Sequence, residues 1–154
     1  EQTLSAINSM NYPTFWFWPN VDAGSDKMSK SIRMYREEKN LETVYFLKNI
    51  SPEDFIKLLA NSKCLVGNSS AGIRECSYIG TPVVNIGNRQ MGRERGDNVT
   101  DVDYNSLMIS KSIQTQIDKG KYPRNILYGD GSAGTKISKL LESQYPNIDK
   151  RINY

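Results

Sequence analysis

Short apolar runs alternate with amphipathic stretches along most of this 154-residue chain. In the amphipathic stretches, apolar residues recur at three- and four-residue spacing, which is typical of helices that bury one face. The apolar runs predict strands at 14–18, 44–47, 64–66, 83–86 and 99–102. The stretches between them predict helices at 26–39, 52–61, 71–78, 104–119 and 133–143.

This alternation indicates the fold class. Strands that alternate with helices of roughly 10 to 15 residues form parallel βαβ units with helices on both faces of the sheet. We therefore expect an α/β fold with a Rossmann-like, doubly wound parallel sheet. Residues 1–154 are enough for a single domain with a sizeable core. Residues 1–10 are expected to be the frayed end of a helix, and the polar last ten residues to be loosely held.

Local signals refine three of these elements. Ser51 followed by Pro52 is typical of a capped helix start, because proline suits the first helical position. Gly80 is expected to end the helix before it, and Pro82 prevents its return. The aromatic run at 15–18 is interpreted as a buried strand rather than an exposed binding platform.

Composition and charge exclude several classes of function. Hydrophobic residues make up 38% and charged residues 24%, which is typical of a soluble, globular chain. No apolar run approaches the ~20 residues of a membrane span, and no signal-peptide pattern begins the chain. The net charge is only +3, and its basic residues are mostly spread out, so nucleic acid is not an expected partner.

Histidine and cysteine usage narrows the chemistry. The chain has no histidine, which removes the commonest general base and the commonest metal ligand, and neither a metal nor a cofactor is expected. Cys64 and Cys76 are interpreted as buried free thiols in a reducing compartment, so a cytoplasmic location is expected.

A small, hydroxyl-rich turn at 67–72 lies where a predicted strand passes into a helix. Its glycines and alanine let a ligand approach the backbone, and the hydroxyls of Ser69 and Ser70 can bind phosphate oxygens together with the first helical N–H groups. The turn is neither a dinucleotide fingerprint nor a P-loop. The alternative is a turn in which a serine only caps the helix.

Two further groups are candidates for the same site. Glu75, one turn inside the helix, suits the two hydroxyls of a ribose, although it could instead be an exposed carboxylate paired with Arg74. The loop between two glycines, at 87–96, holds three arginines whose guanidinium groups suit phosphate. The alternative is a solvated loop stabilised by its own acids. The three arginines are Arg89, Arg93 and Arg95, and the two acids are Glu94 and Asp97.

Several motifs of the chain resemble the hydrolysing UDP-N-acetylglucosamine 2-epimerases, in particular the branch that feeds sialic acid synthesis. The motifs are Asn68–Glu75, Gly80–Glu94, Pro19–Ser25 and Tyr128–Gly131, and the resemblance runs from about Pro13 to Leu141. It implies the C-terminal half of a GT-B architecture, which has two Rossmann domains with the active site between them. The substrate- and nucleotide-binding residues that we expect are Ile50, Ser69, Ser70, Ala71, Gly72, Glu75, Arg89 and Arg93.

The resemblance also implies roles for these residues. Residues 69–72 would hold the diphosphate, Glu75 the ribose hydroxyls and Arg89 the nucleotide, while Ile50 falls in the loop that passes the base. Members of the family remove the C2 proton, eliminate UDP from C1 and add water to the glycal, which yields N-acetylmannosamine. Family members of this kind act on UDP-N-acetylglucosamine, and we expect that sugar nucleotide or UDP as partner.

The chain lacks several parts that the family has, because it corresponds to the C-terminal domain alone. It lacks the first strand of that domain, which carries a histidine in the family. It also lacks the proton-transfer carboxylates, which lie in the family's N-terminal domain. We therefore expect no catalytic residue here, no activity in isolation, and as partners a missing N-terminal domain and a homo-oligomer of the full-length enzyme. By analogy the missing strand is central, between the strands at 14–18 and 64–66. Alternatives are a GDP-sugar 2-epimerase of the same family, a GT-B glycosyltransferase donor domain and a non-enzymatic nucleotide-sugar sensor.

Overall fold

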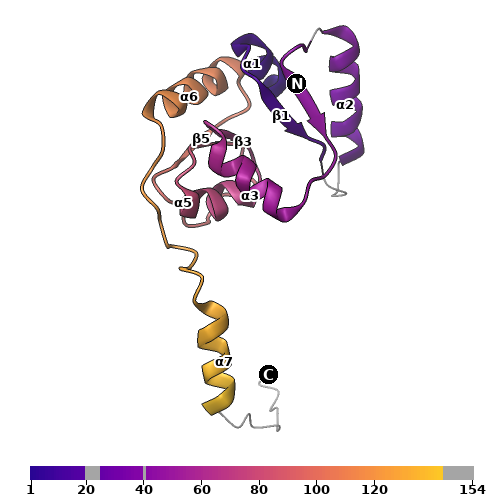
Figure 1. The fold of residues 1–154 in the computed structure, drawn as a ribbon. Helices are drawn as coiled ribbons and strands as arrows, with labels where there is room; N and C mark the ends of the chain where they lie inside the picture. Colours follow the sequence, from indigo (N-terminus) through magenta and orange to yellow (C-terminus); the bar gives the residue numbers. More distant parts are fainter. Residues whose placement is uncertain (20–24, 40, 144–154) are drawn as a thin grey trace, which may run out of the picture.

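The computed structural model describes residues 1–19, 25–39 and 41–143 and has the alternating order expected from the sequence (Figure 1). The strands are β1 (Thr14–Phe17), β2 (Val44–Leu47), β3 (Leu65–Gly67), β4 (Val83–Ile86) and β5 (Val99–Val102). The helices are α1 (Gln2–Met10), α2 (Ser25–Glu38), α3 (Pro52–Asn61), α4 (Ser70–Ile73), α5 (Glu75–Ile79), α6 (Ser106–Lys119) and α7 (Ala133–Ser143).

The strands form two parallel sheets, and β1 and β3, between which a missing strand was expected, belong to different ones. β1 pairs with β2, and a three-stranded sheet has the order β3-β4-β5. Within the second sheet Leu65 lies opposite Val83, which lies opposite Val99. All of these pairings are parallel, and the predicted βαβ units are confirmed for β1–α2–β2 and for β3–α4–α5–β4, whereas a loop without a helix joins β4 to β5.

Helices cover both faces of the three-stranded sheet. Val84 and Ile86 belong to a core cluster with residues of α1 and α6, which lie side by side in Figure 1. Val83, on the other face of β4, packs in a second cluster with Leu59 of α3 and Cys76 of α5. Alternate residues of β4 therefore serve two helical layers, which is the doubly wound arrangement.

Helix α1 and strand β1 differ from expectation. α1 is not frayed, because Leu4, Ala6 and Ile7 are buried and the helix packs against α6. The aromatic run is not fully buried, because Phe15 is 52% exposed and contacts the exposed ring of Tyr45. The burial of α1 and the exposure of Phe15 both depend on which distant elements pack against them. A local pattern of residues does not contain this information.

The helix predicted at 71–78 is two short helices. α4 ends at Ile73, and Arg74, at φ −94° and ψ −72°, separates it from α5. Two predicted helix ends are confirmed. The Ser51 hydroxyl accepts from the Asp54 N–H at 3.1 Å at the start of α3, and Gly80, at φ 81°, ends α5. The motif residues 20–24 and the tail from 144 on lie outside the described residues.

Helix α7 stands apart from the two sheets (Figure 1). None of its residues is buried, and Ile137, Leu140 and Leu141 are exposed by more than half. Within the part of the chain that the structure describes, no helix has both the length and the apolar character to cross a membrane.

Candidate functional site

The turn after β3 is organised by Ser69. This residue is the N-cap of α4, and its hydroxyl oxygen accepts from the Ala71 N–H at 3.3 Å, while its carbonyl accepts from the Gly72 N–H at 3.2 Å. Both bonds are long for their type. Ser69 is exposed and Ser70 is half-buried. The turn therefore presents two hydroxyl groups near solvent, and Ser69 also has the capping role that was the alternative interpretation.

Gly72 faces the sheet. A Cβ atom at this position would lie 2.8 Å from Val83 Cγ1 and 3.4 Å from Leu65 Cδ2. Ala71 and Gly72 are both buried. Gly72 thus permits α4 to pack closely against β3 and β4, and this packing fixes where the hydroxyl-bearing turn lies. The sequence had suggested that small residues leave room for a ligand.

Glu75 opens α5, directly after the break at Arg74. It is half-buried, and among the described residues no ion pair joins it to Arg74. The next residue, Cys76, is fully buried, and burial, with a smaller effect of the Glu75 charge, raises the pKa of its thiol to about 12. Glu75 therefore lies at the boundary between the core and the surface of α5.

Arg95 holds the loop after β4 in place. Its guanidinium forms an ion pair with Asp101 of β5 and donates to the Gln90 carbonyl at 2.6 Å. Asp101 also accepts from Asn85 Nδ2 at 2.6 Å, and Asn85 lies opposite it in the β4–β5 register. Arg95 is therefore an anchor of the loop. The alternative interpretation has the loop stabilised by Glu94 and Asp97, whereas the acid that pairs with Arg95 is Asp101.

Arg89 and Arg93 lie on the same loop, and both are exposed. The loop is fastened a second time further along, where the Tyr128 hydroxyl donates to the Glu94 carbonyl at 2.7 Å. A loop fastened at two places holds its arginines in a restricted region at the end of β4. Such guanidinium groups suit phosphate oxygens.

Gln90 connects this arginine loop to the serine turn. Its Nε2 donates to the Asn68 carbonyl at 2.8 Å, and Asn68 directly precedes Ser69. The side chain is only 3% exposed, and its Oε1 has no hydrogen-bond partner among the described residues. Sequence reasoning gave Gln90 no role. The available signal was an uncharged amide directly beside Arg89 in a strongly basic loop.

Ile50 is not brought to the turn by any hydrogen bond among the described residues. It follows β2, in the other sheet, and is half-buried. Its N–H instead donates to the neighbouring Asn49 Oδ1 at 3.0 Å. The loops after β3 and β4 are therefore joined directly, whereas no hydrogen bond among the described residues joins Ile50 to either of them.

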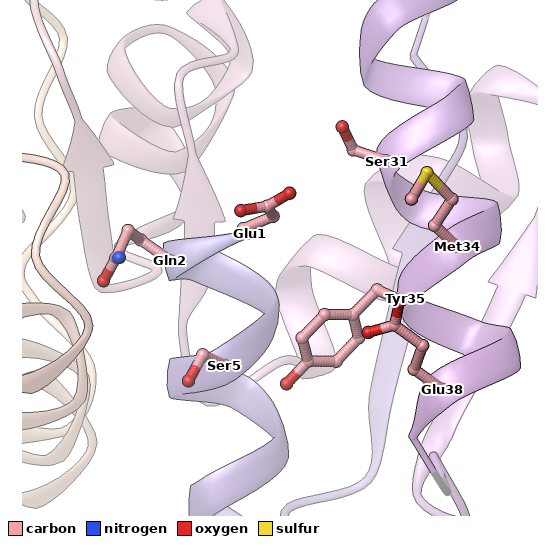
Figure 2. A pocket seen from close by; sticks show the side chains of 7 residues that line it. All are labelled: Glu1, Gln2, Ser5, Ser31, Met34, Tyr35 and Glu38. Carbon is pink, nitrogen blue, oxygen red and sulfur yellow. The ribbon is translucent and has the colours of Figure 1, made fainter.

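A hollow of the described surface lies away from these two loops. Figure 2 shows an open pocket of 260 Å³ between α1 and α2, with the Tyr35 ring directed towards α1. Its lining residues are Glu1, Gln2, Ser5, Ser31, Met34, Tyr35 and Glu38. Two carboxylates make it unfavourable for an anion, and it contains none of the residues of the two loops. Among the described residues there is also no group of three or more His, Cys, Asp or Glu side chains that could hold a metal ion.

Comparison with known proteins gives concordant matches. The sequence profile of the family described as UDP-N-acetylglucosamine 2-epimerase matches residues 1–142. The chain is 33% identical over 143 residues to the UDP-N,N'-diacetylbacillosamine 2-epimerase (hydrolyzing) of Legionella pneumophila. The aligned part covers 93% of this chain and 37% of that relative. The chain is 31% identical over 141 residues to the UDP-N-acetylglucosamine 2-epimerase of Neisseria meningitidis, covering 92% of this chain and 36% of the relative.

A solved structure has the same fold. The crystal structure of Methanocaldococcus jannaschii UDP-GlcNAc 2-epimerase, in complex with UDP-GlcNAc and UDP, matches with a TM-score of 0.69 at 13% identity, over 93% of this chain and 39% of that one. This confirms the expected fold class, a Rossmann-like α/β unit that corresponds to one half of a GT-B architecture. The chain spans little more than a third of the length of the Legionella and Neisseria relatives.

Proposed function

Because the chain belongs to the UDP-N-acetylglucosamine 2-epimerase family, we propose that it is the nucleotide-binding domain of a hydrolysing member of that family. The complete enzyme converts UDP-N-acetylglucosamine and water to N-acetylmannosamine and UDP. A base removes the C2 proton, the C1–O bond to UDP breaks with formation of a glycal, and water then adds with inverted configuration at C2. The family profile and the hydrolysing relative support this proposal.

The observation that carries the proposal is the hydrogen bond between the two loops. Gln90 Nε2 donates to the Asn68 carbonyl at 2.8 Å, so the turn with Ser69 and the loop with Arg89 are held together at the carboxyl ends of adjacent parallel strands. In open α/β sheets, ligands bind outside these strand ends. Donors and cations gathered there suit the diphosphate, whose negative charge grows as UDP leaves C1.

The residues of this chain would act by binding. Hydroxyl groups of Ser69 and Ser70 would donate to the diphosphate, and the buried Ala71 and Gly72 would hold the turn close to the sheet so that these hydroxyls reach it. Arg89 and Arg93 would neutralise its charge, and Glu75 would accept from the ribose hydroxyls. Ile50 would lie along the base. The chain has no histidine, and we assign it no proton-transfer group.

The proton-transfer groups would come from the rest of a longer protein. The chain spans 36–37% of the relatives' length, and β1 and β3 belong to separate sheets although one core cluster includes residues of β2 and β4. We propose that a parallel strand of the longer protein lies between β1 and β3 and that its N-terminal domain completes the active site. We also propose that the complete enzyme is a homo-oligomer, that it is cytoplasmic and that it serves sialic acid synthesis.

Product analysis of the complete protein tests the proposed reaction. We expect UDP and free N-acetylmannosamine in equal amounts, and in D₂O one deuterium at C2 of the product, because that C–H bond is broken and remade. A glycosylated acceptor would instead indicate a glycosyltransferase. Calorimetric titration with UDP, GDP and UDP-N-acetylglucosamine then separates a uridine site from a guanosine site. If none of the three binds to the folded protein, the proposal is wrong.

A further inference from the structure

We propose that Gln90 is a positioning residue, which fixes the serine turn against the arginine loop and does so at a cost in folding stability. This inference deepens the proposed function, because it says what holds the two halves of the nucleotide site together. It makes a claim about the ligand-free protein as well, so it can be tested separately from nucleotide binding.

The geometry gives Gln90 contacts on both sides. Its side-chain Nε2 donates to the Asn68 carbonyl of the turn. The main-chain carbonyl of Gln90 accepts from the Arg95 guanidinium at 2.6 Å. Arg95 is in turn paired with Asp101 on β5. A continuous series of polar contacts thus runs from the edge strand of the sheet, through the arginine loop, to the residue before Ser69.

The cost lies at the other end of the same amide. Gln90 Oε1 is buried with no hydrogen-bond partner among the described residues. A buried acceptor that has lost its water without gaining a donor destabilises the folded state. If the side chain served only to fill this space, an apolar side chain of the same size would make the folded protein more stable than the amide does. We therefore assign the amide its role through the bond that Nε2 makes to the turn.

A second buried glutamine shows the opposite arrangement and serves as the matched control. Gln116 of α6 is 2% exposed, and both ends of its amide are fully used. Its Nε2 donates to the carbonyls of Val83 and Asn98 and to Thr100 Oγ1, while its Oε1 accepts from the Tyr122 hydroxyl at 2.7 Å. None of these hydrogen-bond partners belongs to the turn at 67–72 or to the loop at 87–96, so the replacement of Gln116 should affect stability alone.

The test is the pair Gln90→Met and Gln116→Met, because methionine keeps nearly the same volume and shape without the polar atoms. In the ligand-free chain, Gln90→Met should raise amide hydrogen exchange at Ala71, Gly72 and Ile73 about three- to tenfold, which corresponds to one lost hydrogen bond. Its melting temperature should stay the same or rise. Gln116→Met should lower the melting temperature.

UDP affinity provides the second measurement. Gln90→Met should weaken the Kd for UDP about three- to tenfold, whereas Gln116→Met, assayed below its melting temperature, should leave it unchanged. The inference is overturned if Gln90→Met leaves exchange at the turn unchanged, or if it lowers the melting temperature as Gln116→Met does. If the exchange result is as expected but the unmutated chain does not bind UDP, Gln90 keeps its positioning role and the proposed nucleotide site is wrong.

Discussion

The two ends of the three-stranded sheet treat their polar side chains differently. At the amino ends of β4 and β5, buried groups satisfy one another: Ser77 Oγ donates to Asn98 Oδ1 at 2.9 Å, and Asn98 Nδ2 donates to the Thr81 carbonyl at 2.9 Å. Gln116 uses its whole amide in the same region. At the carboxyl ends of β3 and β4, Ser69, Arg89 and Arg93 are exposed, and Gln90 keeps a buried oxygen unpaired.

This difference separates the parts of the molecule that stabilise the fold from the part that can bind a ligand. Buried polar groups that are fully paired contribute to a unique, stable core. A buried group left without a partner in a native structure calls for an explanation, and a functional role is one of the common ones. The carboxyl end is therefore where mutations should change binding, and the amino end is where they should change stability.

The largest effect is expected at the amino end. Gln116→Met should lower the free energy of unfolding by about 3–4 kcal/mol, because it leaves the Tyr122 hydroxyl and buried carbonyl groups without partners. Urea unfolding followed by circular dichroism measures this. Thr115→Ala, at an exposed position of the same helix, is the control and should change the value by less than about 0.5 kcal/mol. A loss as small as that in Gln116→Met would remove the distinction between the two ends.

The next effect is expected at the carboxyl end. In the complete enzyme, Glu75→Ala should weaken nucleotide affinity by about 1–3 kcal/mol, because a charged acceptor for the ribose hydroxyls is lost. Inhibition by UDP measures the change. Glu37→Ala removes an exposed carboxylate of α2 and should not alter it. Unchanged inhibition in the Glu75 variant would refute the ribose role.

Gly72→Ala tests the contact between the serine turn and the core, because Gly72 lies where the turn packs on the sheet. The added Cβ would lie 2.8 Å from Val83 Cγ1, so the buried valine or the helix must shift. We expect a loss of about 1–2 kcal/mol in the free energy of unfolding. Gly134→Ala, in α7, is the control, because nothing lies within 4 Å of its added Cβ. Equal stability of both variants in chemical denaturation would show that α4 does not need this close approach.

A smaller effect is expected from the Cys76 thiol. Burial raises its pKa from 9.0 to about 12, so above pH 9 the unfolded chain loses this proton while the folded protein keeps it. Stability should therefore fall as the pH rises through 9, by about 1 kcal/mol for this thiol at pH 10, and should be unaffected below pH 8. Comparing Cys76→Ala with the unmutated chain at pH 7 and pH 10 isolates the contribution. A pH-independent difference would show that the thiol titrates normally.

The sequence predicted those features that depend on neighbouring residues. The five described strands, the Ser51 cap and the left-handed Gly80 all follow from local patterns. The sequence did not predict features that depend on residues distant in the chain. The bond from Asn85 to Asp101 follows from the β4–β5 register, and the burial of α1 depends on α6. The bond from Gln90 to Asn68 joins two loops 22 residues apart, and no spacing rule anticipates it.

An NMR titration of the full chain with UDP tests the central claim most directly, because it reports each backbone amide separately. The account predicts saturable chemical-shift changes at residues 68–75 and 87–95, with little change at Asn98, Gln116 and Tyr122. Changes centred on the pocket between α1 and α2, which Tyr35 lines, or the absence of any saturable change in a folded chain, would contradict it.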